Sequence, residues 1–415
     1  MRVRCAALSY HGEHVTNSRG AGERSDHWAA LIAGYLGWTL DAFDFFLVVF
    51  CLTAIGRDFK VTDAQMAGTL GVTLAFRPVG AFLFGLLADR YGRRLPLMID
   101  LVFYSIVEVA SGLAPNFTTF LVLRALFGIG MGGEWGVGAS LAMEKVPPRL
   151  RGVLSGFLQQ GYAMGNLLAA GCYFLLFERF GWRPLFFVGG LPALLALFVR
   201  VRVKESEVWQ KTRHESWGQL GAAIARNWKL FLYIAIFMMT MNLASHGTQD
   251  MYPTFLKRQW GFSVARVAVI SAVSMMGAIA GGTLCGWMSD RWGRRRVITG
   301  ALMGAVLIVP LWAFAPTMPL LVAGAFLMQF LVQGAWGVIP AHLAELSPDA
   351  VRGFLPGFGY QCGVLLASSV PYIEAVFARR TSYAVAMAAT AATVFLMAAA
   401  AAMLGPERRG TRFGT

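Results

Sequence analysis

Charged side chains are scarce in this sequence of 415 residues, where Asp, Glu, Lys and Arg together make up 14%. A soluble domain usually carries about 25%, so a soluble class is disfavoured. Cysteine is also rare. The five cysteines are scattered without CxxC or Cys/His spacing, which argues against a disulfide framework and a metal site. No GxxxxGK[ST] loop is present to hold ATP, and no nucleophile–base pair has a recognisable spacing. Neither an enzyme nor a cofactor is predicted.

Most of the sequence consists of long apolar runs, which are separated by short charged loops. About twelve runs are long enough to cross a bilayer, which a helix does in roughly 20 residues. Residues 1–27 are polar, lack the apolar core of a signal peptide, and are expected to form a loose cytoplasmic tail. We expect membrane spans at 28–55, 65–88, 95–114, 117–143, 151–177, 182–200, 229–255, 264–288, 296–314, 317–345, 353–377 and 381–404.

The basic residues that give the net charge of +14 are concentrated in every second loop. With the N-terminus taken as cytoplasmic, 25 of the 36 Lys and Arg residues fall on the cytoplasmic side and 9 on the opposite side, while Arg77 and Arg124 lie inside helices. This asymmetry is the positive-inside pattern. Membrane topology therefore explains the excess of basic over acidic residues, and no nucleic-acid partner is predicted. The pattern also predicts a multi-pass protein of the plasma (inner) membrane with both termini in the cytoplasm.

A segment of the first half recurs 201 residues later. Gly85–Arg94 reads GLLADRYGRR and Gly286–Arg295 reads GWMSDRWGRR, and at the same offset Glu144 matches Glu345. Such a repeat predicts two related six-helix halves, a transporter design with its site near the midplane between them. The expected units are a tail (1–27), an N-terminal bundle (28–200), a cytoplasmic linker loop (201–228), a C-terminal bundle (229–404) and a cytoplasmic C-terminal tail (405–415).

The repeated element resembles the signature loop of the major facilitator superfamily, and the resemblance covers nearly the whole chain. It implies an all-α integral membrane protein with twelve transmembrane helices in two pseudo-symmetric bundles. It also implies that the loop latches the halves in one state without touching substrate. Asp89 and Asp290 could face a helix N-terminus or a neighbouring arginine in contacts that break as the halves rock. The expected latch residues are Gly85, Asp89, Arg90, Gly92, Arg93, Asp290, Arg291, Gly293 and Arg294.

Residues 242–254 place polar side chains inside an otherwise apolar run. They read NLASHGTQDMYPT and fit N-x-x-[S/T]-H-x-[S/T]-Q-D-x-x-x-T at every fixed position. This resembles the helix-7 signature of the lactate/pyruvate–proton symporters within the sialate:proton symporter family. Residues 37–46 and 77–81 look like helices 1 and 2 of that family. The resemblance implies import of a small monocarboxylate with a proton by alternating access, with His246 and Asp250 acting together in coupling and affinity.

Helical spacing predicts how this polar stretch is arranged. The 201-residue offset pairs Asp41 with Asn242 and Asp44 with Ser245, so helices 1 and 7 are expected to bring polar faces to the same depth. Interhelical hydrogen bonding is the alternative role for Ser245 and for Thr248. The positions i, i+3, i+4 and i+7 share one helix face, and they hold the candidate substrate contacts Asn242, Ser245, His246 and Gln249.

Arg77 lies near the middle of helix 2. A buried guanidinium needs an anionic partner, and its planar fork suits a carboxylate. We therefore predict that Arg77 binds the substrate carboxylate. The alternative is a permanent pair with Asp41 or Asp44. Both can belong to one mechanism, in which a partner that takes up a proton releases Arg77 to the substrate.

A proton carrier must change its charge near the working pH, which histidine does readily and a buried carboxyl can do. For Asp250 the alternative is a salt bridge at an outer gate. For Glu134 it is a structural pair with Arg124. The candidates for proton coupling are Asp41, Asp44, Glu134, His246 and Asp250.

Other functions remain open at this stage. The rival substrate is another organic anion, such as a sialate, a dicarboxylate or an aromatic acid. A non-transporting nutrient sensor is the rival from another class, disfavoured by two short tails. The expected partners are a small organic anion, a proton and the lipid bilayer, and a monomer is expected by analogy.

Overall fold

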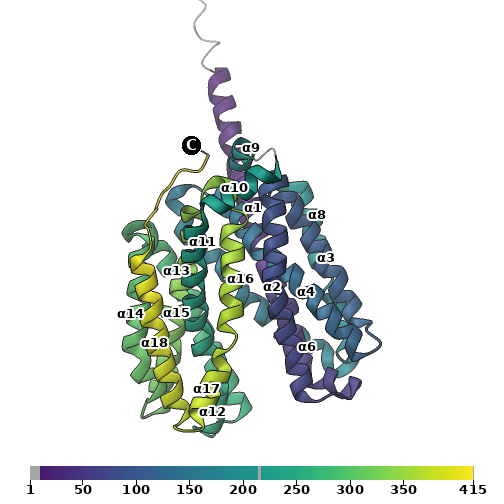
Figure 1. Ribbon diagram of the computed structural model, residues 1–415, viewed down its shortest axis with the longest axis vertical. Coiled ribbons are helices and arrows are strands. Elements are labelled where there is room, and N and C mark those ends of the chain that lie inside the picture. Colours follow the sequence, from purple (N-terminus) through teal and green to yellow (C-terminus); the bar gives the residue numbers. More distant parts are fainter. Residues whose placement is uncertain (1–9, 214–215, 415) are drawn as a thin grey trace, which may run out of the picture.

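The computed structural model describes residues 10–213 and 216–414, and every regular element in that part of the chain is a helix (Figure 1). The N-terminal bundle contains α1 (Tyr10–Phe59), α2 (Asp63–Tyr91), α3 (Arg94–Gly112), α4 (Phe117–Lys145), η1 (Pro148–Leu150), α5 (Arg151–Gln159), α6 (Gly161–Phe180), α7 (Arg183–Val188) and α8 (Pro192–Arg202). The C-terminal bundle contains α11 (Trp228–Gln249), α12 (Tyr252–Arg258), α13 (Val264–Trp292), α14 (Arg294–Ala313), α15 (Met318–Leu346), η2 (Asp349–Val351), α16 (Leu355–Ala367), α17 (Val370–Ala378) and α18 (Tyr383–Leu404).

These helices form the twelve-span membrane fold expected from the sequence. Within the described ranges, ten helical segments are long and apolar enough to cross a membrane. The other two expected spans, the fifth and the eleventh, are each divided into two shorter helices. α5 and α6 are separated at Gln160, and α16 and α17 at Ser368 and Ser369.

Two connecting segments differ from expectation. α1 extends back to Tyr10, so residues 10–27 continue the first helix rather than forming a loose tail, while residues 1–9 lie outside the described residues. No proline interrupts that stretch. The linker 201–228 is only partly a loop, because it contains α9 (Glu207–Thr212) and α10 (Trp217–Arg226). Ser206 and Ser216 start these helices by accepting a backbone N–H with their side chains, as N-cap residues do.

The internal repeat is visible in the helices themselves. The bounds of α2 and α13 differ by 201 residues at both ends, as do those of α4 and α15. α2 packs against α4 in one half, and α13 packs against α15 in the other. The hydroxyls of Thr62 and Ser263 cap the first helix of each pair. The repeat in the sequence therefore reports a repeat in packing.

At the contact between the two bundles, one helix of each bundle packs against two helices of the other. α5 packs against α13 and α15, and α16 packs against α2 and α4. Figure 1 shows the bundles close together at the end that carries α9 and α10, here called the linker end, and diverging toward the opposite or far end. At the contact between α4 and α16, a Cβ built on Gly136 would lie 2.6 Å from Cα of Gly357. Only glycine fits at that crossing.

Candidate functional site

The repeated loop forms two matching contacts between the halves at the linker end. The carboxylate of Asp89 accepts hydrogen bonds from the backbone N–H groups of Gly353 and Phe354, at 2.8 and 3.0 Å. Arg93 donates to the same carboxylate at 2.6 Å. These contacts join α2 of one half to the residues just before α16 of the other.

Asp290 repeats the arrangement in the opposite direction. It accepts from the backbone N–H groups of Gly152 and Val153, at 2.8 and 3.0 Å, and from Arg294 at 2.8 Å. Gly152 and Val153 begin α5, so both carboxylates meet a chain segment at a helix N-terminus, where anions are favourable. This is the geometry expected for Asp89 and Asp290. Their part in a transport cycle stays a prediction.

The other latch candidates lie around these contacts. Gly92 and Gly293 have φ values of 101° and 99°, a region that favours glycine, where the chain turns between helices. Gly85 packs on the backbone of Phe354, because a Cβ there would lie 2.9 Å from Cα of that residue. Arg90 belongs to the last turn of α2, and Arg291 stacks on Trp287 at 4.1 Å.

Two buried glutamates extend the contact. Glu144 pairs with Arg93 at 3.1 Å and with Arg352 of the other half at 3.5 Å. Its repeat equivalent Glu345 pairs with Arg294 at 2.9 Å and with Arg151 of the other half at 3.5 Å. Burial alone would lower the pKa of Arg93, but Glu144 and Asp89 outweigh it and raise that pKa. The guanidinium therefore stays charged.

The C-terminal tail adds a bridge that the sequence did not predict. The ring of Phe413 lies 3.6 Å from the guanidinium carbon of Arg151 and 3.7 Å from that of Arg352, one arginine from each half. The backbone N–H of Gly410 donates to Glu345 at 3.1 Å. The linker end is thus closed by charge pairs, backbone hydrogen bonds and a tail residue.

A cavity of about 90 Å³ lies between the halves. The predicted stripe on α11 lines it with all four members, and Asp250 joins them from the residue that follows the helix. Arg77 faces the stripe from α2. The wall is completed by Trp38, Phe45, Leu74, Met131, Gln159, Tyr162, Gln333, Trp336, Tyr360 and Val364.

The stripe is held by hydrogen bonds that reach a neighbouring helix. Gln249 donates to Gln329 of α15 at 2.9 Å, and Gln333 of the same helix donates to Ser245 at 3.3 Å. Nδ1 of His246 lies 3.0 Å from Oδ2 of Asp250. Ser245 therefore makes the interhelical hydrogen bond that was its alternative role, while still lining the cavity.

Arg77 is buried, with 5% of its surface exposed. Within the described part of the chain it forms no ion pair, and its Nε and Nη2 atoms have no hydrogen-bond partner. Its guanidinium carbon lies 5.9 Å from the ring centre of Tyr360. A permanent pair with Asp41 or Asp44 is therefore not present in this conformation.

Three predicted proton carriers do not line the cavity. Asp41, Asp44 and Glu134 are fully buried inside the N-terminal bundle, and none of their carboxylate oxygens has a hydrogen-bond partner among the described residues. A Cβ on Gly189 would lie 2.8 Å from Oδ1 of Asp44, which places this acid toward the segment between α7 and α8. In this conformation the cavity wall includes neither Asp41 nor Asp44, and the expectation that helices 1 and 7 bring polar faces to the same depth stays a prediction. Trp38 and Phe45 are the cavity residues of helix 1.

The structural pair of Glu134 with Arg124, the alternative to a proton-coupling role, is not formed. Arg124 donates to Glu108 of α3 at 2.6 Å and to Ser111 at 2.5 Å. Both Arg124 and Glu134 belong to α4, and ten residues of helix rise about 15 Å, which is beyond the reach of the two side chains.

Sequence reasoning missed two acids of α3. Asp100 and Glu108 are fully buried in the N-terminal bundle. Their signal was present, because an ionisable residue inside an apolar span is a functional candidate by default, and both fall within the expected span 95–114. The aromatic cavity residues Trp38 and Trp336 carry no such signal, because aromatic side chains are common throughout these helices.

The comparisons with known proteins agree with this architecture. The family described as "Sugar (and other) transporter" matches residues 13–227, and "Major Facilitator Superfamily" matches residues 250–413. A carboxylic acid transporter protein homolog of Saccharomyces cerevisiae is 29% identical, over 92% of this chain and 68% of the yeast protein. The sialic acid transporter NanX of Escherichia coli is 28% identical, over 89% of this chain and 92% of that protein.

A solved structure has the same fold. The proton:xylose symporter XylE bound to 6-bromo-6-deoxy-D-glucose matches with a TM-score of 0.75, over 94% of this chain and 98% of that chain. At 18% identity this likeness concerns the arrangement of the helices only.

Proposed function

The chain belongs to the major facilitator superfamily, and on that premise we propose that it imports a small monocarboxylate, of the lactate or pyruvate type, together with a proton. The observation that carries the proposal is Arg77, a buried guanidinium at the wall of the central cavity that has no ion pair among the described residues. A buried charge without a counter-charge is costly. A carboxylate ligand would supply the missing partner in a bidentate contact.

The size of the cavity favours a small acid. One water molecule needs about 10–15 Å³ measured in this way. A cavity of about 90 Å³ therefore holds roughly six to nine waters, comparable with the handful of non-hydrogen atoms in a three-carbon hydroxy acid. A sugar acid would require the site to widen. The relatives named for carboxylic acid and sialic acid transport support an organic anion as the substrate class.

Two groups of residues support proton coupling. His246 and Asp250 face the cavity as a pair. Behind Arg77, the N-terminal bundle buries the carboxyl groups of Asp41, Glu134 and Asp100 without hydrogen-bond donors among the described residues. A protonated carboxyl is far cheaper to bury than an unpaired carboxylate. The proposed sequence is that a proton enters the His246–Asp250 pair while the substrate carboxylate binds Arg77.

Alternating access would use the contacts at the linker end. With the linker end taken as cytoplasmic, the structure corresponds to a state closed toward the cytoplasm, in which Asp89 and Asp290 hold the halves together. Loading would favour their release, and the halves would rock about the cavity. We propose a monomer in the inner membrane as the working unit.

The deciding experiment measures proton uptake driven by a lactate gradient in proteoliposomes with a trapped pH indicator. Arg77→Ala is expected to abolish the signal and Arg77→Lys to retain part of it, because a lysine keeps the charge but loses the planar fork. Arg379→Ala, an exposed arginine at the far end, is the matched control. Normal uptake by Arg77→Ala would remove the carboxylate role from this residue.

The alternative substrate is a different organic anion. A thermal-stability screen of the purified protein with lactate, pyruvate, a sialate, a dicarboxylate and an aromatic acid would separate these. Stabilisation by only the larger acids would reject the monocarboxylate and retain the transporter.

A further inference from the structure

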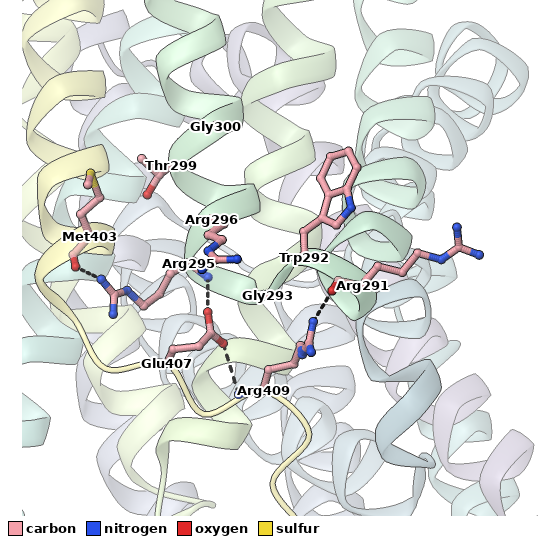
Figure 2. A pocket seen from close by; sticks show the side chains of 10 residues that line it. All are labelled: Arg291, Trp292, Gly293, Arg295, Arg296, Thr299, Gly300, Met403, Glu407 and Arg409. Carbon is pink, nitrogen blue, oxygen red and sulfur yellow. Dashed lines mark hydrogen bonds between the residues drawn. The ribbon is translucent and has the colours of Figure 1, made fainter.

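A second, larger cavity lies at the linker end of the C-terminal bundle. It has a volume of about 840 Å³ and lies between the start of α14, the end of α18 and the following tail (Figure 2). Its lining includes four arginines, Arg291, Arg295, Arg296 and Arg409, against one acid, Glu407. The cavity is therefore strongly positive, and the transport site described above does not include it.

Part of this charge holds the cavity in shape. Glu407 accepts from the backbone N–H of Arg295 at 2.9 Å and from that of Arg409 at 3.2 Å. The Arg295 guanidinium donates to the carbonyls of Ala402 and Met403 at the end of α18, as Figure 2 shows for Met403. The tail and both helices are thus fixed to one another, and the cavity has a built wall.

Other donors have no partner. Within the described ranges, the Arg296 guanidinium has neither a hydrogen bond nor an ion pair, and the hydroxyl of Thr299 is buried without a partner. A Cβ on Gly300 would meet nothing within 4 Å. An arginine fork, a hydroxyl and open space suit an anionic headgroup, because guanidinium binds phosphate bidentately.

Exposed apolar side chains lie next to this cavity. Positions 296, 300, 303 and 307 fall on one face of α14, since they are spaced at i, i+4, i+7 and i+11. Below Arg296 and Gly300 on this stripe come Met303, which is 42% exposed, and Leu307, which is 78% exposed. Trp292, at the cavity itself, is also exposed and is a residue type enriched at the membrane–water interface. Charge at the interface and an apolar track beneath it match a headgroup and its acyl chains.

The internal repeat supplies a comparison within the same chain. The N-terminal half keeps the scaffold, because Glu205 accepts from the backbone N–H groups of Arg93 and Arg94 as Glu407 does from Arg294 and Arg295. At the 201-residue offset, the positions of Arg296, Thr299 and Gly300 are occupied by apolar residues, Leu95, Met98 and Ile99. The arginine, the hydroxyl and the open glycine of this cavity are therefore particular to the C-terminal half.

We infer that this cavity binds the phosphate headgroup of an anionic glycerophospholipid, with Arg296 and Thr299 as ligands and the α14 stripe as the acyl-chain track. Basic pockets at the cytoplasmic ends of transmembrane helices are suited to such headgroups. A soluble phosphate shares the headgroup chemistry but makes no use of the exposed apolar stripe. The site is independent of the transported substrate.

The test is native mass spectrometry of the full chain, purified in a neutral detergent and supplied with phosphatidylglycerol or phosphatidylcholine of identical acyl chains. The wild type is expected to retain phosphatidylglycerol preferentially. Arg296→Leu is expected to weaken retention about fivefold, the loss of one arginine's attraction to an anionic lipid. Arg296→Leu with Gly300→Ile, which installs the residues of the other half, is expected to abolish the preference.

Arg380→Leu removes the same charge at the far end and should leave retention unchanged. Inorganic phosphate is added in a parallel sample at equal concentration. The inference is overturned if the double variant binds phosphatidylglycerol as the wild type does, or if inorganic phosphate displaces the lipid fully, which would make this a site for a soluble anion. A raised melting temperature with phosphatidylglycerol that is lost in Arg296→Leu would support the inference in a second readout.

Discussion

Nδ1 of His246 lies 3.0 Å from Oδ2 of Asp250, one helical turn further along the chain at the cavity wall. Their side chains are 31% and 35% exposed, so both reach the water of the cavity. Imidazole and carboxylate together can accept one proton and share it. This pair lines the same cavity as Arg77, which belongs to the opposite half.

The first prediction concerns this pair. Asp250→Asn keeps the shape of the side chain but replaces the carboxylate that contacts Nδ1 of His246, and a hydrogen bond to a charged group is worth about 1.5–3 kcal/mol. Proton-driven lactate accumulation in proteoliposomes is expected to fall at least about tenfold. Lactate exchange without a proton gradient should persist. Asp58→Asn, at an exposed pair with Arg183, is the matched control. Accumulation at the wild-type level in Asp250→Asn would separate this residue from coupling.

A second prediction concerns the buried pair of Arg124 and Glu108. Arg124→Leu leaves a carboxylate buried alone, and breaking such a pair costs about 3–5 kcal/mol. The apparent melting temperature of the purified protein in detergent should drop clearly. Arg124→Leu combined with Glu108→Leu should recover much of the loss, because no charge then remains unpaired. Equal melting of the wild type and the single variant would show that Glu108 is already neutral.

A third prediction concerns the contact of Asp89 with Gly353 and Phe354. Asp89→Asn weakens charge-assisted hydrogen bonds of about 1.5–3 kcal/mol each, so the linker end should open more often. Ser155→Cys serves as a reporter, because Ser155 is buried at the contact with Gly337. Its thiol should react with a water-soluble maleimide roughly tenfold faster in the Asp89→Asn background.

Asp26→Asn provides the control for this measurement. Asp26 of α1 pairs with Lys204 of the linker at 2.8 Å, so this ion pair does not join the two bundles. Its removal should leave the labelling rate of Ser155→Cys unchanged, and the parent without the added thiol corrects for the native cysteines. If both acid variants accelerate labelling equally, the effect comes from a general loosening of the linker end.

A fourth prediction concerns the glycine crossing of α4 and α16. A Cβ at Gly136 would lie 2.6 Å from Cα of Gly357, and overpacking of this kind costs about 1–3 kcal/mol. Gly136→Ala should therefore disfavour the state closed at the linker end and slow lactate uptake. Gly171→Ala, where a Cβ meets nothing within 4 Å, is the control. Uptake by Gly136→Ala equal to that of the control would mean that the helices shift apart at little cost.

The parts of this protein that could be predicted are those that one helix or one repeat determines. The match of Gly85–Arg94 to Gly286–Arg295 predicted two equivalent helix pairs, and α2 and α13 keep the same offset at both ends. Likewise, the stripe from Asn242 to Gln249 depends only on the period of one helix, and all its members line the cavity.

The errors came from contacts between helices. Asp44 and Arg124 were recognised as unusual, but sequence periodicity does not say which neighbour a side chain faces. Arg124 donates a hydrogen bond to Glu108 of α3, and Asp44 lies next to Gly189, between α7 and α8. The bridge of Phe413 escaped notice for the same reason, since its two arginines come from opposite halves.

The duplicated carboxylate contact has a consequence for the kinetics of opening. Asp89 of the N-terminal half accepts a hydrogen bond from Gly353 of the other half, and Asp290 of the C-terminal half accepts one from Gly152. When one contact breaks, the other loses the alignment that its hydrogen bonds need, so the two tend to fail together. The protein should then open in a single cooperative step rather than through a populated half-open intermediate, and two identical restraints would set one common threshold for the transition.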